Sequence, residues 1–219
     1  MYVGRIVAGG WNREGNPVLM YRVSSRSFPN RRALLKADQA AIIPKEGFEN
    51  DIHKNPYIAY NCLKVVSDEV AVISNGTHTD HIAIKLAAGW SPRDALAGVL
   101  MGMDYEHDTL NTPRIAAVMD RREEKLYLGT VRDDALLVRA FAMQAGTAYY
   151  VATYEHNAPE ERYRDGEFTV ETPETACDYV LGQGVFGELE RPISAVAALW
   201  QAERGWQIAA KDAPASRDK

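Results

Sequence analysis

The sequence predicts an α+β fold in which sheets built from antiparallel hairpins pack face to face and helices cover them from outside. The first observation is a series of short apolar runs separated by turn residues, which is typical of hairpins. The second is a single pair of amphipathic helical segments near the middle of the chain. The third is size and composition, since 219 residues that are 46% hydrophobic can bury a full core. We expect one domain over residues 1–212, with two small domains as the alternative, and a flexible tail over 213–219.

The first third of the chain contains three predicted strands. Tyr2–Ala8 alternates apolar and polar residues and ends at Gly9-Gly10. A turn over Asn12–Asn16 leads into Val18–Val23, so these two strands are predicted to form a hairpin. Ala40–Ile43, just before a proline, is predicted to be a short buried strand.

A second hairpin and the helical pair follow. Tyr57–Val66 and Glu69–Ile73 are predicted to pair around a Ser-Asp turn. The first helix is expected over Thr79–Ala88, because the following glycine accepts the left-handed conformation that ends many helices. The second opens at Ser91 as N-cap with proline at the first helical position. Its apolar residues follow helical spacing at Leu96, Val99, Leu100 and Met103.

The second half of the chain returns to strands, with one more helix. That helix is expected to begin at Thr172-Pro173 and to end near Gly182. The polar segment His156–Glu167 is the best candidate for a mobile loop. Predicted strands cover Arg114–Met119, Lys125–Val131, Leu136–Ala142, Thr147–Tyr154, Ile193–Gln201 and Trp206–Lys211, the last two forming a hairpin.

Charge and cysteine content exclude several function classes. A net charge of -5 argues against a nucleic-acid-binding protein, which usually carries a basic face. The two cysteines, Cys62 and Cys177, lie far apart without metal-ligand spacing. No signal peptide or apolar run of about 20 residues is present, so a cytoplasmic protein without contact to membranes is expected.

The segment Tyr21–Arg31 is the most informative polar stretch. A predicted strand leads into three serines, an asparagine and three arginines, and hydroxyls with guanidinium groups suit an anion with several oxygens, above all a phosphate. An ordinary solvated loop is the alternative. Arg26 and Arg31 rank first because they lie in the loop itself. The full set of phosphate candidates is Arg22, Ser24, Ser25, Arg26, Asn30 and Arg31.

Three further polar clusters stand where elements end. In Asn55–Cys62, a buried Tyr60 must bond its hydroxyl to a ligand or to a backbone carbonyl, and Cys62 is more typical of a small buried residue than of a nucleophile. Ser74–Asp80 offers hydroxyls and free N–H groups at a helix start, which suits an anion but also an ordinary N-cap turn. His78, His81 and Asp80 there do not have metal-ligand spacing. Met103–Asp108 gathers acids at a helix C-terminus, where the helix dipole disfavours them.

Taken in order, the strings MYVGR, YRVSSRSFPNR, NPYIAYNC, SNGTHTD, MDYEHD and NTPRIA resemble the archaeal-type IMP cyclohydrolase family. The resemblance covers nearly the whole chain and is densest over residues 1–120. It implies a four-layer αββα fold like that of the N-terminal-nucleophile hydrolases, and closure of the purine ring in the last step of IMP synthesis. It also implies a homo-oligomer. The chain begins Met1-Tyr2 and not with the Cys, Ser or Thr that hydrolysis by such enzymes requires.

The ring closure assigns roles to the polar residues. A carboxamide nitrogen attacks a formyl carbon on the same ring, and the carbinolamine then loses water, so neither a cofactor nor a metal is expected. Tyr60 is predicted to donate to the formyl oxygen, and Glu106, with Asp104 as its competitor, to relay a proton. Asn75 or Asn61 is predicted to orient the carboxamide. Further substrate contacts are expected from Gly76, Thr112 and Arg114.

Two other functions stay open from the sequence alone. One is an amidohydrolase of the N-terminal-nucleophile type, which a processed terminus would reveal. The other is a non-catalytic purine-nucleotide-binding protein.

Overall fold

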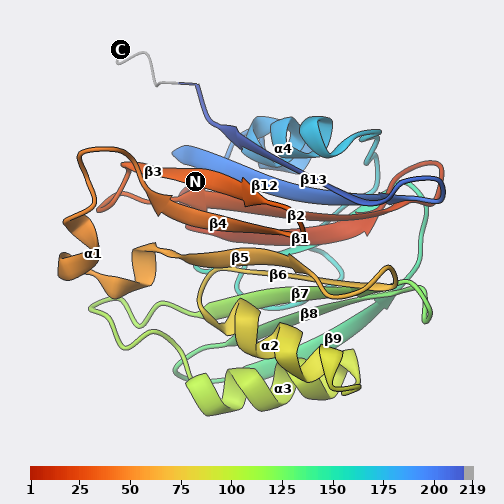
Figure 1. Cartoon of the computed structure of the whole chain (residues 1–219), viewed down its shortest axis with the longest axis horizontal. Helices are drawn as coiled ribbons and strands as arrows, with labels where there is room; N and C mark the ends of the chain where they lie inside the picture. The colour runs from red at the N-terminus through yellow and green to blue at the C-terminus, as the bar shows by residue number, and fades with distance from the viewer. Residues whose placement is uncertain (215–219) are drawn as a thin grey trace.

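The computed structural model describes residues 1–214 and has four layers (Figure 1). Helix α4 (Pro173–Gly182) covers a six-stranded sheet, a seven-stranded sheet lies beneath, and α2 (His78–Ala87) and α3 (Pro92–Met103) cover its far side. The predicted layered α+β fold and its αββα order are therefore confirmed.

The six-stranded sheet joins both ends of the chain. Its order is β11-β10-β1-β2-β12-β13, and all of its named pairs are antiparallel. The predicted first and last hairpins are β1–β2 and β12–β13. Its strands are β1 (Ile6–Trp11), β2 (Pro17–Ser24), β10 (Thr147–Ala152), β11 (Arg164–Asp165), β12 (Pro192–Gln201) and β13 (Gly205–Asp212).

The seven-stranded sheet is an antiparallel meander that follows the chain order from β3 to β9. Its first strand also lies against β12 and β13, so the sheet curves onto the edge of the other one. Its strands are β3 (Arg31–Lys36), β4 (Gln39–Pro44), β5 (Tyr60–Val65), β6 (Val70–Ser74), β7 (Arg114–Asp120), β8 (Lys125–Val131) and β9 (Leu136–Ala142).

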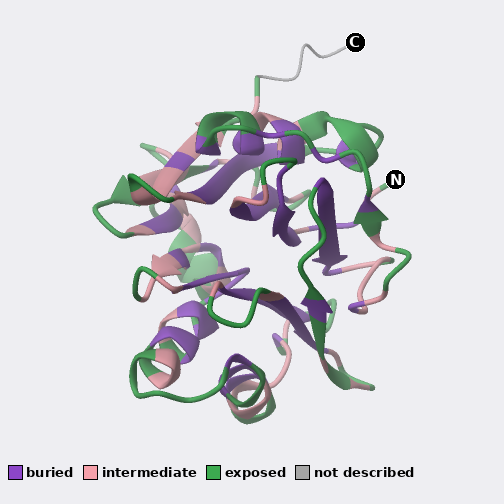
Figure 2. Cartoon of the chain, turned by 90° about the vertical axis from the view of Figure 1, so that its right-hand side faces the viewer, coloured by how far each residue is buried: buried purple, intermediate pink, exposed green. Residues whose placement is uncertain are grey.

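Apolar side chains form one core between the sheets and one between each sheet and its helices (Figure 2). Strand β2 contributes to two of them because successive side chains point to opposite faces. Leu19 and Tyr21 enter the core between the sheets, whereas Val18 and Met20 face α4. The same alternation determines whether a polar residue of β2 faces α4 or the space between the sheets.

The predicted helix termini are confirmed in detail. The Ser91 side chain accepts a hydrogen bond from the Asp94 amide, as an N-cap does. Gly89 takes a φ of +85°, the left-handed conformation expected at the end of α2. Thr172 caps α4 through a reciprocal pair of hydrogen bonds with Thr175.

Some local predictions were wrong. Part of the expected Arg-Ser loop is the strand β3, which pairs with β4. A 3-10 turn (Pro56–Ile58), preceded by the short helix α1 (Asp51–Lys54), stands where the strand was expected to begin, and that strand, β5, starts at Tyr60. The expected loop over residues 156–167 contains the two-residue strand β11. Residues 215–219 of the expected tail lie outside the described residues.

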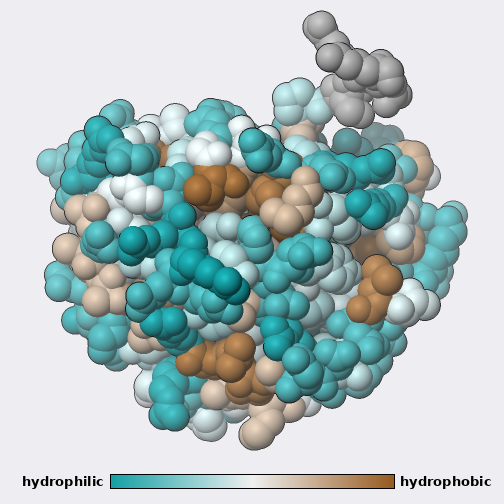
Figure 3. Space-filling model, turned by 180° about the vertical axis from the view of Figure 1, so that it is seen from behind, coloured by the Kyte–Doolittle hydropathy of each residue, from teal (hydrophilic) through white to brown (hydrophobic). Residues whose placement is uncertain are grey.

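The surface carries separate apolar patches divided by polar atoms on the face shown in Figure 3. In the described part of the chain, no helix is long and apolar enough to cross a membrane.

Candidate active site

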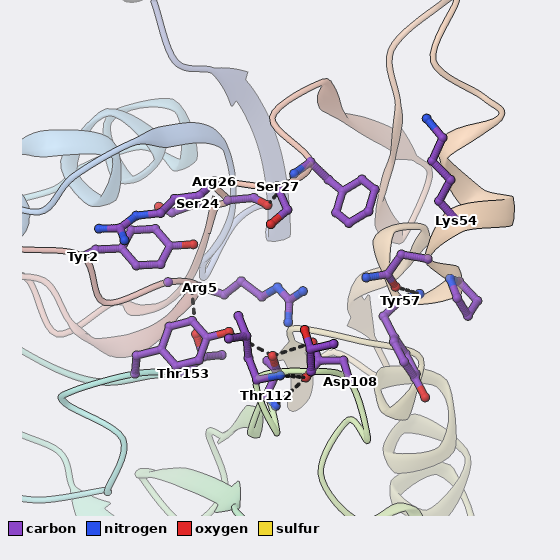
Figure 4. Close-up of a pocket in the computed structure, with 18 of the residues that line it drawn as sticks. Tyr2, Arg5, Ser24, Arg26, Ser27, Lys54, Tyr57, Asp108, Thr112 and Thr153 are labelled. Carbon is purple, nitrogen blue, oxygen red and sulfur yellow. Dashed lines mark hydrogen bonds between the residues drawn. The ribbon is translucent and has the colours of Figure 1, made fainter.

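A cavity of about 780 Å³ opens at one end of the two sheets (Figure 4). Five segments that are distant in sequence line it, and they fall within residues 2–5, 24–28, 54–57, 107–112 and 153–154. Its size is that of a small-molecule site. Segments that flank strands of both sheets contribute, so the cavity exists only in the folded four-layer arrangement.

One wall of the cavity is rich in hydroxyls. Ser24, Ser25 and Ser27 line it together with Arg26. The guanidinium of Arg26 lies 4.2 Å from the centre of the Tyr2 ring and 3.5 Å from a carboxylate oxygen of Glu190. More than half of its side chain is exposed, so it is free to turn toward an anion in the cavity.

Arg5 reaches from the cavity to a buried carboxylate. Its Nη1 donates to Oε2 of Glu106 at 3.0 Å, and Nη1 of Arg114 lies 3.7 Å from Oε1. Burial raises the pKa of Glu106, and the two guanidinium groups only partly oppose that effect. Burial alone would lower the pKa of Arg5, but the nearby Glu106, Tyr60 and Tyr21 raise it above its usual value. The cluster therefore holds a carboxyl group of raised pKa against a permanent positive charge.

A pair of buried tyrosines lies beside the same arginine. The hydroxyls of Tyr21 and Tyr60 are 2.6 Å apart. Burial raises the pKa of Tyr60, although the neighbouring positive charges of Arg31 and Arg5 oppose this. Both phenols are neutral at ordinary pH, so the pair supplies a hydroxyl donor.

Arg31 lies beneath the serine-rich wall. Its Nε donates to the carbonyl of Phe28, a residue of the cavity lining. Its Nη1 and Nη2 are buried without a partner among the described residues, and no carboxylate pairs with it there. Burial lowers its pKa, and Tyr60 is the neighbour that most opposes this. An unpaired buried guanidinium is costly unless a ligand completes its hydrogen bonds.

Many of the predicted residues come together here. Ser24, Ser25, Arg26 and Thr112 line the cavity. Thr112 donates to Asp108 and lies 2.9 Å from the Tyr154 hydroxyl, which fixes that part of the wall. Tyr60, Glu106, Arg31 and Arg114 form the buried cluster behind Arg5.

Arg22 is not part of the site. It lies on the α4 side of β2, where its guanidinium donates to main-chain carbonyls of residues 180–190, including Leu189 at 2.6 Å and Glu190 at 2.8 Å. Its Nε donates to Ser24. Strand alternation places it there, so the expectation that it binds phosphate does not fit the geometry.

Neither asparagine predicted to orient the carboxamide faces the cavity. Asn75 donates to the Pro113 carbonyl and accepts from the Ile115 amide, which joins the end of β6 to β7. Asn61 points to the other face of β5 and donates to Asp80 on α2. The side chain of Asn75 is buried within the protein, and that of Asn61 is engaged by a helix.

The remaining candidates lie around the cluster without lining the cavity. The Asp104 side chain is half exposed beside His107, so Glu106 is the better placed of the two carboxylates. The carbonyl of Asp104 accepts from Arg114 Nε at 2.7 Å. Gly76 approaches the buried Arg114 closely, and the Asn30 carbonyl accepts a hydrogen bond from the amide of Lys45, which follows β4.

Several residues of the site were not predicted from the sequence. Arg5 and Tyr2 belong to the opening MYVGR, to which no role was given, and Tyr21 looked like one apolar residue of a strand. Tyr57 and Lys54 form the wall opposite Tyr2 and Arg26 (Figure 4), and Tyr154 is a further lining residue. Arg5 carried a usable signal, as the one charged residue within the predicted strand Tyr2–Ala8. Among the described residues, no group of three His, Cys, Asp or Glu side chains is arranged to hold a metal ion.

The family match and the similar proteins carry the same description. Residues 2–204 match the family described as IMP cyclohydrolase-like protein. An IMP cyclohydrolase of Methanocaldococcus jannaschii is 45% identical over 96% of this chain and 99% of its own length. One from Methanosphaera stadtmanae is 41% identical over 95% of this chain and 98% of its own. A third, from Methanocella arvoryzae, is 51% identical over 71% of this chain and 75% of its own.

Proposed function

Because this chain belongs to the IMP cyclohydrolase family, we propose that its cavity closes the purine ring of 5-formamidoimidazole-4-carboxamide ribotide to give IMP and water. The observation that carries the assignment of the site is the position of Glu106. This carboxyl group is fully buried, is bonded to Arg5 at the cavity wall, and lies in a cluster that also holds a neutral tyrosine pair.

We propose that the serine-rich wall holds the ribotide phosphate. Ser24, Ser25 and Ser27 offer hydroxyl donors, and Arg26 adds a mobile positive charge. Arg31 lies directly beneath this wall with two unpaired nitrogens, so it completes the substrate site from the buried side. Tyr2 and Tyr154, whose stacked rings have centroids 6.0 Å apart, offer an apolar surface beside the phosphate region.

Positioning supplies much of the catalysis in this proposal. The attacking nitrogen and the formyl carbon are substituents of one imidazole ring, so the enzyme has to select the rotamer that brings them together. The walls of the cavity hold the ribose and the ring. Arg114 and Thr112 support the wall beneath them.

In the buried cluster, Tyr60 stabilises the developing negative charge and Glu106 transfers protons. As the carboxamide nitrogen attacks, Tyr60 donates to the formyl oxygen, which takes up negative charge. Glu106 removes a proton from the attacking nitrogen and returns it to that oxygen, giving the carbinolamine. It next takes the proton of the former formamide nitrogen and delivers it to the hydroxyl, which leaves as water. The carboxylate is restored at the end of the cycle.

A spectrophotometric assay with the formamido ribotide tests this proposal. Conversion to IMP changes the absorbance of the base, and purified protein without added metal or cofactor is expected to turn over. A protein that binds IMP but produces no change would be a nucleotide-binding protein without this activity. Intact-mass measurement that found a processed terminus beginning with Cys, Ser or Thr would favour an amidohydrolase.

We also propose that residues 1–212 act as one domain, that the enzyme works in the cytoplasm, and that it forms a homo-oligomer. The outer strand β9 supports the last point. It exposes Leu136 and Leu137 beside backbone groups that no further strand of the described chain covers. Light scattering during size-exclusion chromatography measures the assembly directly.

A further inference from the structure

Three polar atoms that have no hydrogen-bonding partner within residues 1–214 lie in the interior next to the site. They are Oε1 of Glu106, Nη1 of Arg114 and Nδ1 of His78, all of them buried. A Cβ built on Gly76 would lie 3.0 Å from His78 Nδ1 and 3.1 Å from Arg114 Nη1. The imidazole and the guanidinium therefore both border the space that a side chain at Gly76 would fill.

The tautomer of His78 follows from its other nitrogen. Nε2 lies 3.0 Å from the carbonyl of Ile115, and a carbonyl only accepts, so Nε2 carries the hydrogen. Nδ1 is then a lone-pair acceptor. Burial, with the charge of Arg114 as a further cause, lowers the pKa of His78 to about 3, so the ring stays neutral while the enzyme works.

The guanidinium of Arg114 makes one short hydrogen bond, and a second would fix its orientation. Its Nε donates to the Asp104 carbonyl at 2.7 Å, but its Nη1 is 3.7 Å from Glu106, which is too long for a hydrogen bond. Among the described residues, the bond to Asp104 is therefore the one hydrogen bond that orients this guanidinium. The lone pair of His78 is the neutral acceptor placed to fix it.

We propose that His78 is a positioning residue, whose Nδ1 accepts a hydrogen bond from a water molecule that in turn accepts one from Arg114 Nη1, and thereby holds that guanidinium toward Glu106. The proposal rests on the proposed function, in which Glu106 relays the proton. It assigns to the start of α2 a part in the reaction, although no residue of α2 lines the cavity.

The charged groups around Glu106 and His78 determine how a substitution of His78 would change the pKa of Glu106. Glu106 is surrounded by Arg5 from the segment before β1, Arg114 from β7 and Asp108 from its own loop. His78 faces Arg114 and Arg5, with His81 on its own helix. If Arg114 tilts away, the carboxylate of Glu106 loses one of two stabilising charges. Its pKa then rises further, and the acid limb of the kcat profile moves to higher pH.

A pair of isosteric variants separates this role from a structural one. In His78→Gln the side-chain amide reaches the position of Nε2 and can still donate to Ile115, but the acceptor at Nδ1 is lost. In His78→Asn the amide oxygen can take the place of Nδ1, whereas the bond to Ile115 is lost. We expect His78→Gln to lower kcat by about tenfold, the scale of a small misplacement of a catalytic group, with an acid limb at higher pH and little change in KM.

His78→Asn is expected to melt at lower temperature than wild type and to keep its pH profile. Thr79→Val is the matched control, since it removes hydrogen bonds of Thr79 to Gly76 and Ser74 at the same helix start without touching Arg114. It should change the melting temperature alone.

Two results would overturn the proposal. One is a His78→Gln enzyme with the kcat and acid limb of wild type. The other is equal behaviour of the Gln and Asn variants, with changes only in melting temperature. The variant Glu106→Gln distinguishes failure of the proton relay from failure of the positioning role of His78. If that variant turns over normally, the relay itself fails, whereas an inactive Glu106→Gln beside an unaffected His78→Gln rejects only the positioning role.

Discussion

The hydroxyl of Tyr21 on the six-stranded sheet lies 2.6 Å from the hydroxyl of Tyr60 on the seven-stranded sheet. Each phenol has one proton, so only one of them donates to the other. If Tyr60 gives its proton to a substrate oxygen, Tyr21 must donate to Tyr60. In the proposed mechanism, the two sheets would thus share one directed hydrogen-bond chain that ends at the substrate.

Substitution of the two tyrosines should therefore have graded effects. Tyr60→Phe removes the donor to the formyl oxygen and is expected to lower kcat by about 10²-fold. Tyr21→Phe leaves that donor in place and only weakens its polarisation, so a smaller loss, about tenfold, is expected. Steady-state kinetics with both variants, together with IMP binding by calorimetry, measure this. A Tyr60→Phe enzyme with normal kcat would show that Tyr60 is not the donor to the formyl oxygen.

Glu106 should determine how activity depends on pH. Its carboxylate form has to accept the first proton, so kcat rises with pH as the group ionises. Burial raises its pKa above the usual value near 4.5, and the acid limb should lie above that value accordingly. Glu106→Gln is expected to lower kcat by about 10²-fold or more and to abolish this limb. Asp104→Asn, which alters the exposed carboxylate close by, should retain it.

The anion site is tested at Arg26 and Arg31. Arg26→Ala and Arg31→Ala are both expected to raise KM by about tenfold or more, because each removes a charged donor to the substrate. Arg32→Ala is the matched control, since the neighbouring Arg32 is exposed on β3. If neither Arg26→Ala nor Arg31→Ala alters substrate affinity, the phosphate binds elsewhere.

Arg22 should be essential for stability and not for chemistry. Its guanidinium is fully buried and satisfies carbonyls at the end of α4 and in the segment after it, including those of Phe186 and Leu189. Arg22→Ala would leave these groups unpaired and is expected to lower the free energy of unfolding by about 3 kcal/mol or more. Urea denaturation measures this. If Arg22→Ala is stable but binds substrate much more weakly, Arg22 belongs to the substrate-binding site after all.

Substitution of Gly76 by alanine should lower both activity and stability. A methyl group there meets His78 and Arg114 at about the limit of contact, so one of them must move. Gly76→Ala is expected to lower kcat several-fold, with a small loss of stability of about 1 kcal/mol from local overpacking. Gly102→Ala on α3 has open space around its Cβ and serves as the control.

Hydrophobic periodicity and turn residues were sufficient to predict most of the fold. The helix caps at Ser91 and Thr172 and the hairpin β12–β13 follow from local rules that tertiary contacts did not overrule. Strand β3 was missed because its burial is uneven and its arginines look like loop residues. Its strand conformation depends on pairing with β4 and on contact with the other sheet.

The site was only partly predictable for a related reason. Local composition pointed to Tyr60, Glu106 and the serine-rich segment, but which face of a strand a residue occupies depends on register. Arg22 and Asn61 were placed in the site because register was unknown, and both face helices. Arg5 meets Glu106 from 101 positions away, a proximity that only the stacking of the two sheets creates.

The sheet order has a consequence for the synthesis of the enzyme. Strand β2 pairs on one side with β12, and the carbonyls around Arg22 come from residues 180–190, so both wait for the last part of the chain to be made. During translation, the N-terminal hairpin emerges with a charged side chain whose partners do not yet exist. Closing contacts over such long stretches is slow. A nascent chain stalled before β12 should consequently have no enzymatic activity, although every proposed catalytic residue has already been made.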